Sequence, residues 1–520
     1  MRKATIRTIN HPPKYPAMWL LAAAVCFCPA AAGACGLGSG DTATGTEALN
    51  SECGGYDNTA DGFRALYSNT TGYYNAASGA GALLFNTTGH ENTANGYSAL
   101  QANITGNFNT ASGAAALYNN TTGNSNTASG YEALSANTTG SSNTASGYEA
   151  LWENTTGGDN TASGYQALFN NTSGSNNTAS GYNALVANYK GNHNTANGAS
   201  ALYNNTADNN TASGFVALYS NTTGHENTAS GAYALNTNTT GYANAASGYA
   251  ALYANTTGYD NAASGYYALF NNTTGYGNTA DGYYALQSNT TGTGNVAFGY
   301  QALYASKTGG NNVAVGTWGL LALTSGGNNI ALGFGAGKLT TSGSNDIYIG
   351  HAGVNGSESN VTRIGTGQTA TFIAGISGHA LSGATVVVNS AGQLGVVTSS
   401  ARYKKDIRPL SGSAARLAQL RPVSFRYKSE PNAAHYGLIA EEVAQVMPEL
   451  VVRDSAQRPD SVQYIEIVPL LLQQWKAQQT EIARQRQLIE RQQAELAELR
   501  HMLTTRLAAL DKAPGANGAR

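Results

Sequence analysis

The sequence is poor in charge. Only 11% of its 520 residues are Asp, Glu, Lys or Arg, against roughly 25% in an ordinary soluble protein. About two thirds of the Lys and Arg residues lie after residue 400, so the long region before them is nearly neutral. The formal net charge is −2. This balance argues against a nucleic acid or an anionic membrane as a partner held by bulk electrostatics.

Carboxylates are especially scarce between residues 58 and 340, and no pair of them recurs there. Hydrolysis of a glycan generally needs two placed carboxylates, so this region is not expected to be a glycan hydrolase. The calcium-binding repeat Gly-Gly-x-Gly-x-Asp does not recur either. We therefore expect no cofactor and no metal.

Long hydrophobic runs are rare as well. One apolar stretch, residues 17–27, follows a basic leader and precedes the small residues Ala32-Gly33-Ala34. That order is typical of an export signal, and we predict that residues 1–34 form a signal peptide. The stretch is short for a membrane anchor, and no other run is long enough to cross a bilayer.

Cysteine is limited to positions 26, 28, 35 and 53. Cleavage after Ala34 would make Cys35 the first mature residue. Cys35 would then carry a lipid, pair with Cys53 in an oxidising compartment, or stay as a thiol. Ala32 replaces the leucine that usually precedes a lipidated cysteine by three residues. The sequence leaves these alternatives open, and no function is assigned to either cysteine.

One pattern fills more than half of the chain, from about residue 41 to 344. It reads Asn-Thr-Ala-Ser-Gly-Tyr-x-Ala-Leu-x-x-Asn-Thr-Thr-Gly-x-x and restarts about every 17 residues, with one 16-residue copy before Asn210. A short fixed period is typical of one small unit stacked many times, and not of a globular enzyme. We therefore predict a rod of stacked β-coils over residues 41–344.

The repeat is too short for two helices. Asn and Gly tolerate positive φ and mark tight turns. The remaining residues leave room for two strands of about four to five residues in each repeat. The leucine at a fixed place, for example Leu134 and Leu151, is expected to form a ladder that points inward.

The last copies are more apolar, as in Asn295-Val-Ala-Phe-Gly, Asn312-Val-Ala-Val-Gly and Asn329-Ile-Ala-Leu-Gly. Their alternation indicates strands with one buried face. These copies resemble the Asn-x-Val-Ala-Ile-Gly head repeats of trimeric autotransporter adhesins. The resemblance implies a left-handed β-roll built from three chains. Earlier copies have Thr and Ser where that family has Val and Ile.

Two features of the repeats have alternative interpretations. The Asn-x-Thr triplets have the form of glycosylation sequons, but their place at the turn of nearly every repeat favours structural turn residues. The regular threonines suggest an ice-binding hydroxyl array, although the Thr-x-Thr spacing of such arrays is mostly absent. Residues 345–397, where the period fails, are predicted to be a β-rich neck.

At Ser399 the composition changes to a charged, non-repetitive segment. It contains Ser399-Ser-Ala-Arg-Tyr-Lys-Lys-Asp-Ile, Arg421-Pro-Val-Ser-Phe-Arg-Tyr, Tyr436-Gly-Leu-Ile-Ala-Glu-Glu-Val-Ala and Val462-Gln-Tyr-Ile-Glu-Ile-Val-Pro-Leu-Leu. Together and in this order, these stretches resemble the peptidase S74 family, the intramolecular chaperone of endosialidase tailspikes. The resemblance covers about residues 392–510 and places a chaperone domain at 398–463.

The resemblance implies a domain that trimerises a fibre, helps its β-structure fold and then cuts itself off with a Ser–Lys dyad. Ser399 and Lys404 fit the family pattern as nucleophile and base, with Ile407 three residues further on. Ser400 stands where the family has aspartate, so it competes for the role of nucleophile. Lys405 competes for the role of base.

Other polar residues of this segment carry no such expectation. His435 is a lone histidine, and we expect it to have a structural or surface role. Glu441 and Glu442 are expected on a short helix, as a solvated face or as salt-bridge partners.

A heptad pattern follows over residues 464–510. Val468, Trp475, Ile482, Ile489, Leu496, Leu503 and Leu510 are spaced seven apart. This spacing predicts a coiled coil, and the heptads alone do not choose three strands over two. Gln478, Gln485 and Gln492 weaken the second apolar position. The tail, residues 511–520, is rich in Gly, Pro and Ala and is predicted to be disordered.

The sequence thus predicts a mainly β, homotrimeric fibre, secreted or displayed at a bacterial cell surface, with a chaperone that cleaves itself off. An adhesin is the first interpretation, and a phage-derived tail fibre with the same chaperone is the alternative. The recurring tyrosines (Tyr131, Tyr148, Tyr165, Tyr182) either present a ladder to a glycan or protein receptor or shield the edges of the coils.

Overall fold

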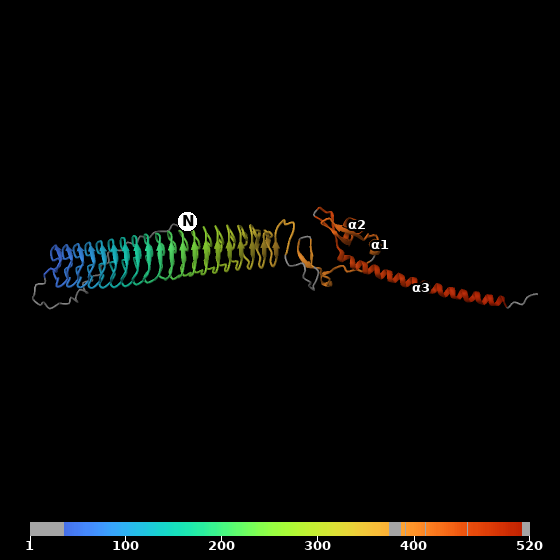
Figure 1. The fold of residues 1–520 in the computed structure, drawn as a ribbon, viewed down its shortest axis with the longest axis horizontal. Helices are drawn as coiled ribbons and strands as arrows, with labels where there is room; N and C mark the ends of the chain where they lie inside the picture. Colours follow the sequence, from blue (N-terminus) through green and yellow to red (C-terminus); the bar gives the residue numbers. More distant parts are fainter. Residues whose placement is uncertain (1–35, 374–385, 390–391, 411, 455, 512–520) are drawn as a thin grey trace, which may run out of the picture. The chain divides into compact units, whose positions relative to one another are not determined.

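The computed structural model describes residues 36–373, 386–389, 392–410, 412–454 and 456–511. The chain forms two compact units, Met1–Phe372 and Ile373–Arg520, and each is described here by itself (Figure 1). The predicted signal peptide and nearly all of the predicted tail lie outside the described residues. Cys53 is disulfide-bonded, and the other three cysteines all precede residue 36.

The first unit is a solenoid whose coils share one 20-stranded parallel sheet (Figure 1). Each coil contributes one short strand, and equivalent residues pair from coil to coil, as Thr127 does with Thr144. The strands of the sheet are β1 (Thr42–Thr44), β2 (Thr59–Asp61), β3 (Ala76–Ser78), β4 (Thr93–Asn95), β5 (Thr110–Ser112), β6 (Thr127–Ser129), β7 (Thr144–Ser146), β8 (Thr161–Ser163), β9 (Thr178–Ser180), β10 (Thr195–Asn197), β11 (Thr211–Ser213), β12 (Thr228–Ser230), β13 (Ala245–Ser247), β14 (Ala262–Ser264), β15 (Thr279–Asp281), β16 (Val296–Phe298), β17 (Val313–Val315), β18 (Ile330–Leu332), β20 (Ile347–Ile349) and β22 (Thr362–Ile364). The prediction of a mainly β rod is confirmed.

The prediction of two strands per repeat is wrong. From β1 to β17 each coil holds a single strand of three residues, such as β6, and the rest of the coil is a series of turns. The cause is backbone geometry, because Glu132 and Leu134 both have left-handed conformations, with φ of 53° and 54°. Left-handed residues alternate with ordinary ones there, so the chain bends repeatedly and cannot extend into a second strand.

A thin apolar core runs along the rod. In a typical coil Ala128, Ala133 and Leu134 are completely buried. The leucine ladder predicted from the sequence is therefore present. Alanine supplies the rest of this core, which leaves little space between the two walls of a coil and little apolar area to stabilise it.

Two ladders of buried asparagine complete the interior. In the first ladder the amide of Asn143 donates hydrogen bonds to the side-chain oxygen of Asn126 (3.1 Å) and to the carbonyl of Gly157 (2.9 Å). In the second, the amide of Asn154 donates to the side-chain oxygen of Asn137 (2.7 Å) and to the same carbonyl of Gly157 (3.0 Å). Both ladders repeat from coil to coil, so buried polar groups find their partners in neighbouring coils.

The turn glycine makes room for this arrangement in the 17-residue coils. A Cβ at Gly157 would overlap the carbonyl oxygen of Gly174 in the next coil and the side chain of Asn154. In the 17-residue coils glycine therefore lets the backbone come close enough to receive both asparagine amides.

The asparagines of the recurring Asn-Thr-Thr sequons belong to the second ladder. Asn137 and Asn154 are completely buried, and each side-chain amide is hydrogen-bonded within the rod. A sugar cannot be attached to these nitrogens in the folded rod. This burial favours the structural interpretation of the recurring Asn-Thr-Thr triplets.

The outward face of the sheet changes character along the rod. Side chains alternate across a strand, so the first and third residues of each strand point outward. These are mainly Thr and Ser up to β15, as with Thr127 and Ser129. From β16 onward they are large and apolar. We call this exposed group the apolar sheet end, and it comprises Phe298, Val315, Ile330, Leu332, Ile349 and Ile364.

The sheet continues beyond residue 344, where the sequence period fails. β20 pairs with β18 and β22 pairs with β20, the last step being 15 residues long. Within these coils β19 (Thr340–Ser342) pairs with β21 (Gly356–Ser357). Tyr348 takes the buried position that alanine holds in earlier coils, and its hydroxyl donates to Glu358 at 2.8 Å. This larger side chain closes the end of the thin core.

The second unit is a small α+β structure with a long helix. Its elements are β23 (Val386–Val388), β24 (Leu394–Val396), η1 (Ala401–Tyr403), α1 (Ser413–Leu417), β25 (Val423–Tyr427), β26 (Glu430–Gly437), α2 (Ala440–Val446), η2 (Pro448–Leu450), β27 (Val451–Arg453), β28 (Pro459–Val462) and α3 (Tyr464–Leu510). Its strands form three antiparallel pairs, β23–β24, β25–β26 and β27–β28. Among the described residues, none of the helices has the length and apolar character that a membrane crossing requires.

The asparagine ladder generates a first prediction. Asn154→Ala removes one buried hydrogen bond from each of Asn137, Gly157 and Asn171. Each loss costs about 1–3 kcal/mol, so amide hydrogen exchange of residues 137–171 should accelerate strongly. Thr156→Ala is the matched control, because Thr156 is exposed and its loss removes the same sequon. Equal effects of the two substitutions would contradict the ladder as the source of stability.

The end of the rod generates a second prediction. The hydrogen bond from Arg363 lowers the pKa of Glu358 below its ordinary value of 4.5, and the Glu358 side chain is largely buried. A lowered carboxyl pKa adds stability above pH 4.5 that is lost as the pH falls through the folded-state pKa. Arg363→Ala should therefore lower the melting temperature at pH 7 and weaken its fall between pH 5 and 3. The exposed pair Arg64–Glu47 is the control, and Arg64→Ala should change little.

Candidate functional site

The candidate catalytic pair lies at the start of the S74-like segment. Ser400 caps the short turn η1, and the backbone N–H of Lys404 closes the turn on the carbonyl of Ala401. This compact turn brings Lys404 back beside Ser399, five residues earlier. The ammonium nitrogen of Lys404 lies 3.5 Å from the hydroxyl oxygen of Ser399. That is the long limit of a hydrogen bond, as is common for catalytic groups before a substrate is engaged.

The two competitors are placed differently. The hydroxyl of Ser400 accepts hydrogen bonds from the backbone N–H and the guanidinium of Arg402, at 3.4 and 3.3 Å. It is therefore occupied in holding the turn. Lys405 is exposed, and no hydrogen bond or ion pair links it to either serine among the described residues. Of the four residues, Ser399 and Lys404 are the two that meet.

Both members of this pair are exposed in the single chain. A lysine removes a proton from serine only in its neutral form, which burial or a nearby cation favours. A catalytic dyad built on this pair would need further burial before it became reactive.

A small core holds together the segment that follows the pair in the sequence. The buried members of this core are Leu417, Val443, Met447, Leu450, Val451, Val462, Ile467 and Leu470. They come from α1, α2 and its C-cap, η2, β27, β28 and the first two turns of α3, so the start of the long helix is part of the folded domain. The hydroxyl of Tyr464 accepts a hydrogen bond from the N–H of Leu438 at 2.8 Å, which ties α3 to the chain after β26.

The remaining polar residues of the segment have structural places. Arg421, just before β25, forms an ion pair with Glu442 of α2. This contact lowers the pKa of the Glu442 carboxyl. His435 lies next to the rings of Phe425 and Tyr427. These positions agree with the structural roles expected for His435 and Glu442. No group of three potential metal ligands occurs in the part of the chain that the structure describes.

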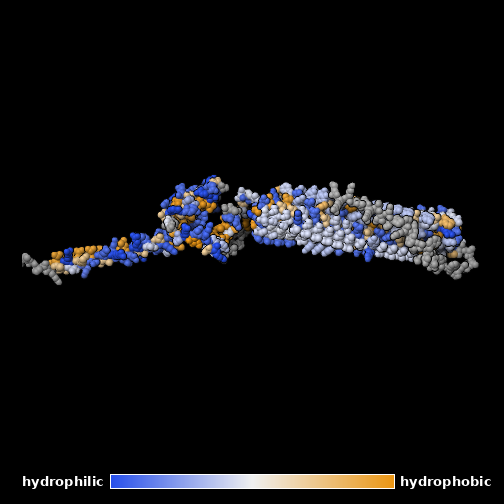
Figure 2. Space-filling view, turned by 180° about the vertical axis from the view of Figure 1, so that it is seen from behind, coloured by the Kyte–Doolittle hydropathy of each residue, from blue (hydrophilic) through white to orange (hydrophobic). Residues whose placement is uncertain are grey.

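The long helix α3 carries its apolar heptad residues on the surface. Ile482, Ile489 and Leu496 are between 42% and 56% exposed. Figure 2 shows apolar residues recurring along this helix. An exposed stripe of this length is typical of a helix that packs against other helices.

Comparison with known families identifies the segment that holds the pair. Residues 399–452 match the peptidase S74 family, chaperone of endosialidase. The match begins at Ser399 and ends within β27, so the S74 segment includes the pair, the β25–β26 hairpin and α2. No curated protein and no solved structure matches the chain.

The tyrosine ladder is the second surface singled out from the sequence. Tyr148, Tyr165 and Tyr182 stack in parallel, with ring centroids 5.2 Å apart. Stacking covers the faces between neighbouring rings, so this column presents ring edges and hydroxyl groups. A sugar ring packs on the face of an aromatic ring, and the stacked column therefore offers it little. This geometry favours the interpretation in which the ladder shields the coil edges.

Proposed function

We propose that this chain is an exported homotrimeric fibre, an adhesin or other extracellular fibre, whose C-terminal segment assembles it and then releases itself by cleavage beside Ser399. The single observation that carries this proposal is the S74 match, which starts at the serine that faces Lys404. In this proposal the rod is the mature product, and the S74 segment assembles it and then cleaves itself off.

The fold of the rod explains the need for a chaperone. A single coil buries two asparagines whose amide partners lie partly in neighbouring coils. It also holds several non-glycine residues in left-handed conformations, each of which costs about 1–2 kcal/mol. An isolated coil is therefore unstable, and folding must begin from a template that supplies the first neighbour.

Two surfaces support a trimer. The exposed heptad stripe of α3 is suited to a coiled coil. The apolar sheet end is exposed on a single chain, although its residues are of the kind that proteins normally bury. Packing three copies of each surface together removes both from water, and the S74 family favours the same assembly.

The proposed cleavage follows from the pair. Neutral Lys404 takes the proton of the Ser399 hydroxyl as its oxygen attacks a neighbouring peptide carbonyl. The peptide C–N bond breaks, and the proton passes to the leaving amine. Water then hydrolyses the serine ester and regenerates the hydroxyl. Attack within one chain removes a large entropic part of the barrier, on the order of 7–11 kcal/mol in well-oriented cases.

Assembly is the proposed trigger. Lys404 is exposed in the single chain, and burial between chains favours its neutral form. Cleavage would then report that the trimer has formed, because an unassembled chain keeps a protonated lysine.

The intact mass of the expressed protein tests this mechanism. The wild type should split into a rod and a fragment of about 120 residues. Ser399→Ala and Lys404→Ala should stay whole and still trimerise, since neither residue belongs to the core. Ser400→Ala and Lys405→Ala are the controls and should still be processed. Normal processing of Lys404→Ala would refute the dyad.

The link between assembly and cleavage is tested separately. Ile489→Asp together with Leu496→Asp places two charges in the apolar stripe of α3. This variant should lose the trimer by native mass spectrometry and slow its processing at least tenfold. Ala494→Asp, on the opposite side of the helix, should keep both. A variant that stays monomeric but is processed at the normal rate would show that burial between chains is not the trigger.

A further inference from the structure

The single 16-residue coil interrupts the regular wall of the rod. Residues 194–209 lack one turn residue, and Ala207 stands where the other coils have the buried glycine. The residue after that glycine begins the corner of each coil. These residues, one from each coil, form a row that we call the corner row. It includes Ser141, Gly158, Ser175, Asn192, Asp208, His225, Tyr242, Tyr259 and Tyr276.

Normally the backbone N–H just after one corner-row residue donates a hydrogen bond to the carbonyl of the corner-row residue in the preceding coil. The N–H of Asn209 donates to the carbonyl of Asn192 at 3.0 Å, and the N–H of Ala243 donates to that of His225 at 3.1 Å. Within the described residues, this series has no corresponding bond from Glu226 to Asp208. The carbonyl of Asp208 instead accepts from the side chain of Asn210 at 3.2 Å. The wall is therefore open between Asp208 and His225.

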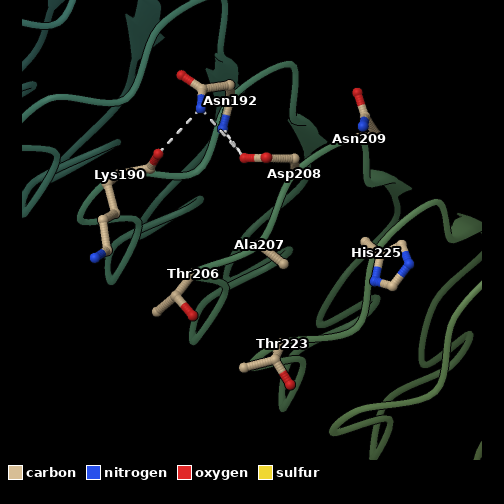
Figure 3. Close-up of a pocket in the computed structure, with 8 residues that line it drawn as sticks. All are labelled: Lys190, Asn192, Thr206, Ala207, Asp208, Asn209, Thr223 and His225. Carbon is tan, nitrogen blue, oxygen red and sulfur yellow. Dashed lines mark hydrogen bonds between the residues drawn. The ribbon is translucent and has the colours of Figure 1, made fainter.

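The opening is a notch with a volume of about 400 Å³, lined by Lys190, Asn192, Thr206, Ala207, Asp208, Asn209, Thr223 and His225 (Figure 3). This size falls in the range of small-molecule sites, roughly 300–1,000 Å³. Figure 3 shows Asp208 turned towards Asn192, whose backbone N–H donates to its carboxylate at 2.7 Å. Asp208 thus leaves the space beside His225 unfilled.

An aromatic column ends at the same place. Tyr276, Tyr259, Tyr242 and His225 stack in parallel, with centroids 4.7 to 5.2 Å apart and interplanar angles of 3° to 5°. Tyr242 covers one face of His225. The corner-row neighbour on the other side is Asp208, and within the described residues no ring stacks on that second face. The notch therefore exposes the end of a rigid aromatic stack.

We propose that this notch binds one pyranose ring of a glycan. The ring would pack its C–H face on His225 and extend the column by one step. The free carboxylate oxygen of Asp208 would accept hydrogen bonds from sugar hydroxyls, with Thr206 and Thr223 as further partners.

The lining selects a polyol over an apolar ring. Ala207 is the one aliphatic residue of the notch, and the others all carry hydrogen-bonding groups. An aromatic ligand would leave these groups without partners, which is costly. A sugar satisfies them with its hydroxyls while its C–H face meets the imidazole.

This inference extends the proposed function by naming a receptor class for the fibre. It does not depend on self-cleavage, since the notch lies wholly in the rod. Three copies would give the fibre three equivalent notches, and weak single contacts would add up on a surface rich in glycans.

The test uses the full chain and saturation-transfer NMR with methyl glycosides of glucose, galactose, mannose, N-acetylglucosamine and glucuronic acid. At least one glycoside should receive saturation at its ring C–H protons. His225→Ala and Asp208→Ala should each weaken that binding at least tenfold. His90→Ala is the matched control, because His90 also ends a stacked column but its other side is covered by Phe108.

A second variant fills the notch without removing any residue. A glycine inserted between Ala207 and Asp208 restores a 17-residue coil, and it should abolish binding while His225 remains. Hydrogen exchange of the rod confirms that each variant is folded. Failure of every glycoside to bind, or binding that survives both the insertion and His225→Ala, would overturn the proposal. An intact, unprocessed chain that still binds sugar would refute only the cleavage mechanism.

Discussion

Hydrogen bonding between neighbouring coils is the constraint on which this rod depends. The apolar interior up to Tyr348 is alanine and leucine, so it cannot hold the coils by burial alone. Two asparagine ladders do so, with the amides of Asn143 and Asn154 meeting on the carbonyl of Gly157. The turn glycine, the single short strand and the exclusion of sugar from the sequons all follow, because each lets one coil approach the next closely enough for these bonds.

The same constraint makes the first coil of the rod difficult to fold on its own. Bonds that exist only between coils give no stability to the first coil, and the left-handed residues add strain before stacking compensates for it. Folding of such an array is cooperative and needs a starting surface. The apolar sheet end lies in the last coils of the rod, towards the S74 segment in the sequence. A chaperone that joins three chains there would give folding its first stable layer.

Much of this architecture was predictable from particular residues. The recurring Leu134 position indicated an inward ladder, and the stretches from Ser399 onward predicted the S74 segment, which the family comparison confirmed. The single strand per coil was not predictable, because left-handed φ at a leucine has no local signature. Sequence reading also ended the rod at residue 344, whereas Tyr348 continues the core in coils of different length. The 16-residue copy was visible in the sequence, but its effect on the wall was not.

The sequence by itself determined the period, the coil length and the order of the segments, because these follow from spacing along one chain. It also supplied Ser399 and Lys404 as a pair at a fixed separation. Only the tertiary structure decided which asparagines are buried, which hydroxyl Lys404 faces and where the wall opens. The buried asparagines and the open wall depend on contacts between residues about 17 positions apart, where one missing residue displaces Asp208 from His225. The partner of Lys404 depends on the fold of the short turn η1. Spacing is a property of the chain, whereas bond partners are a property of the stack.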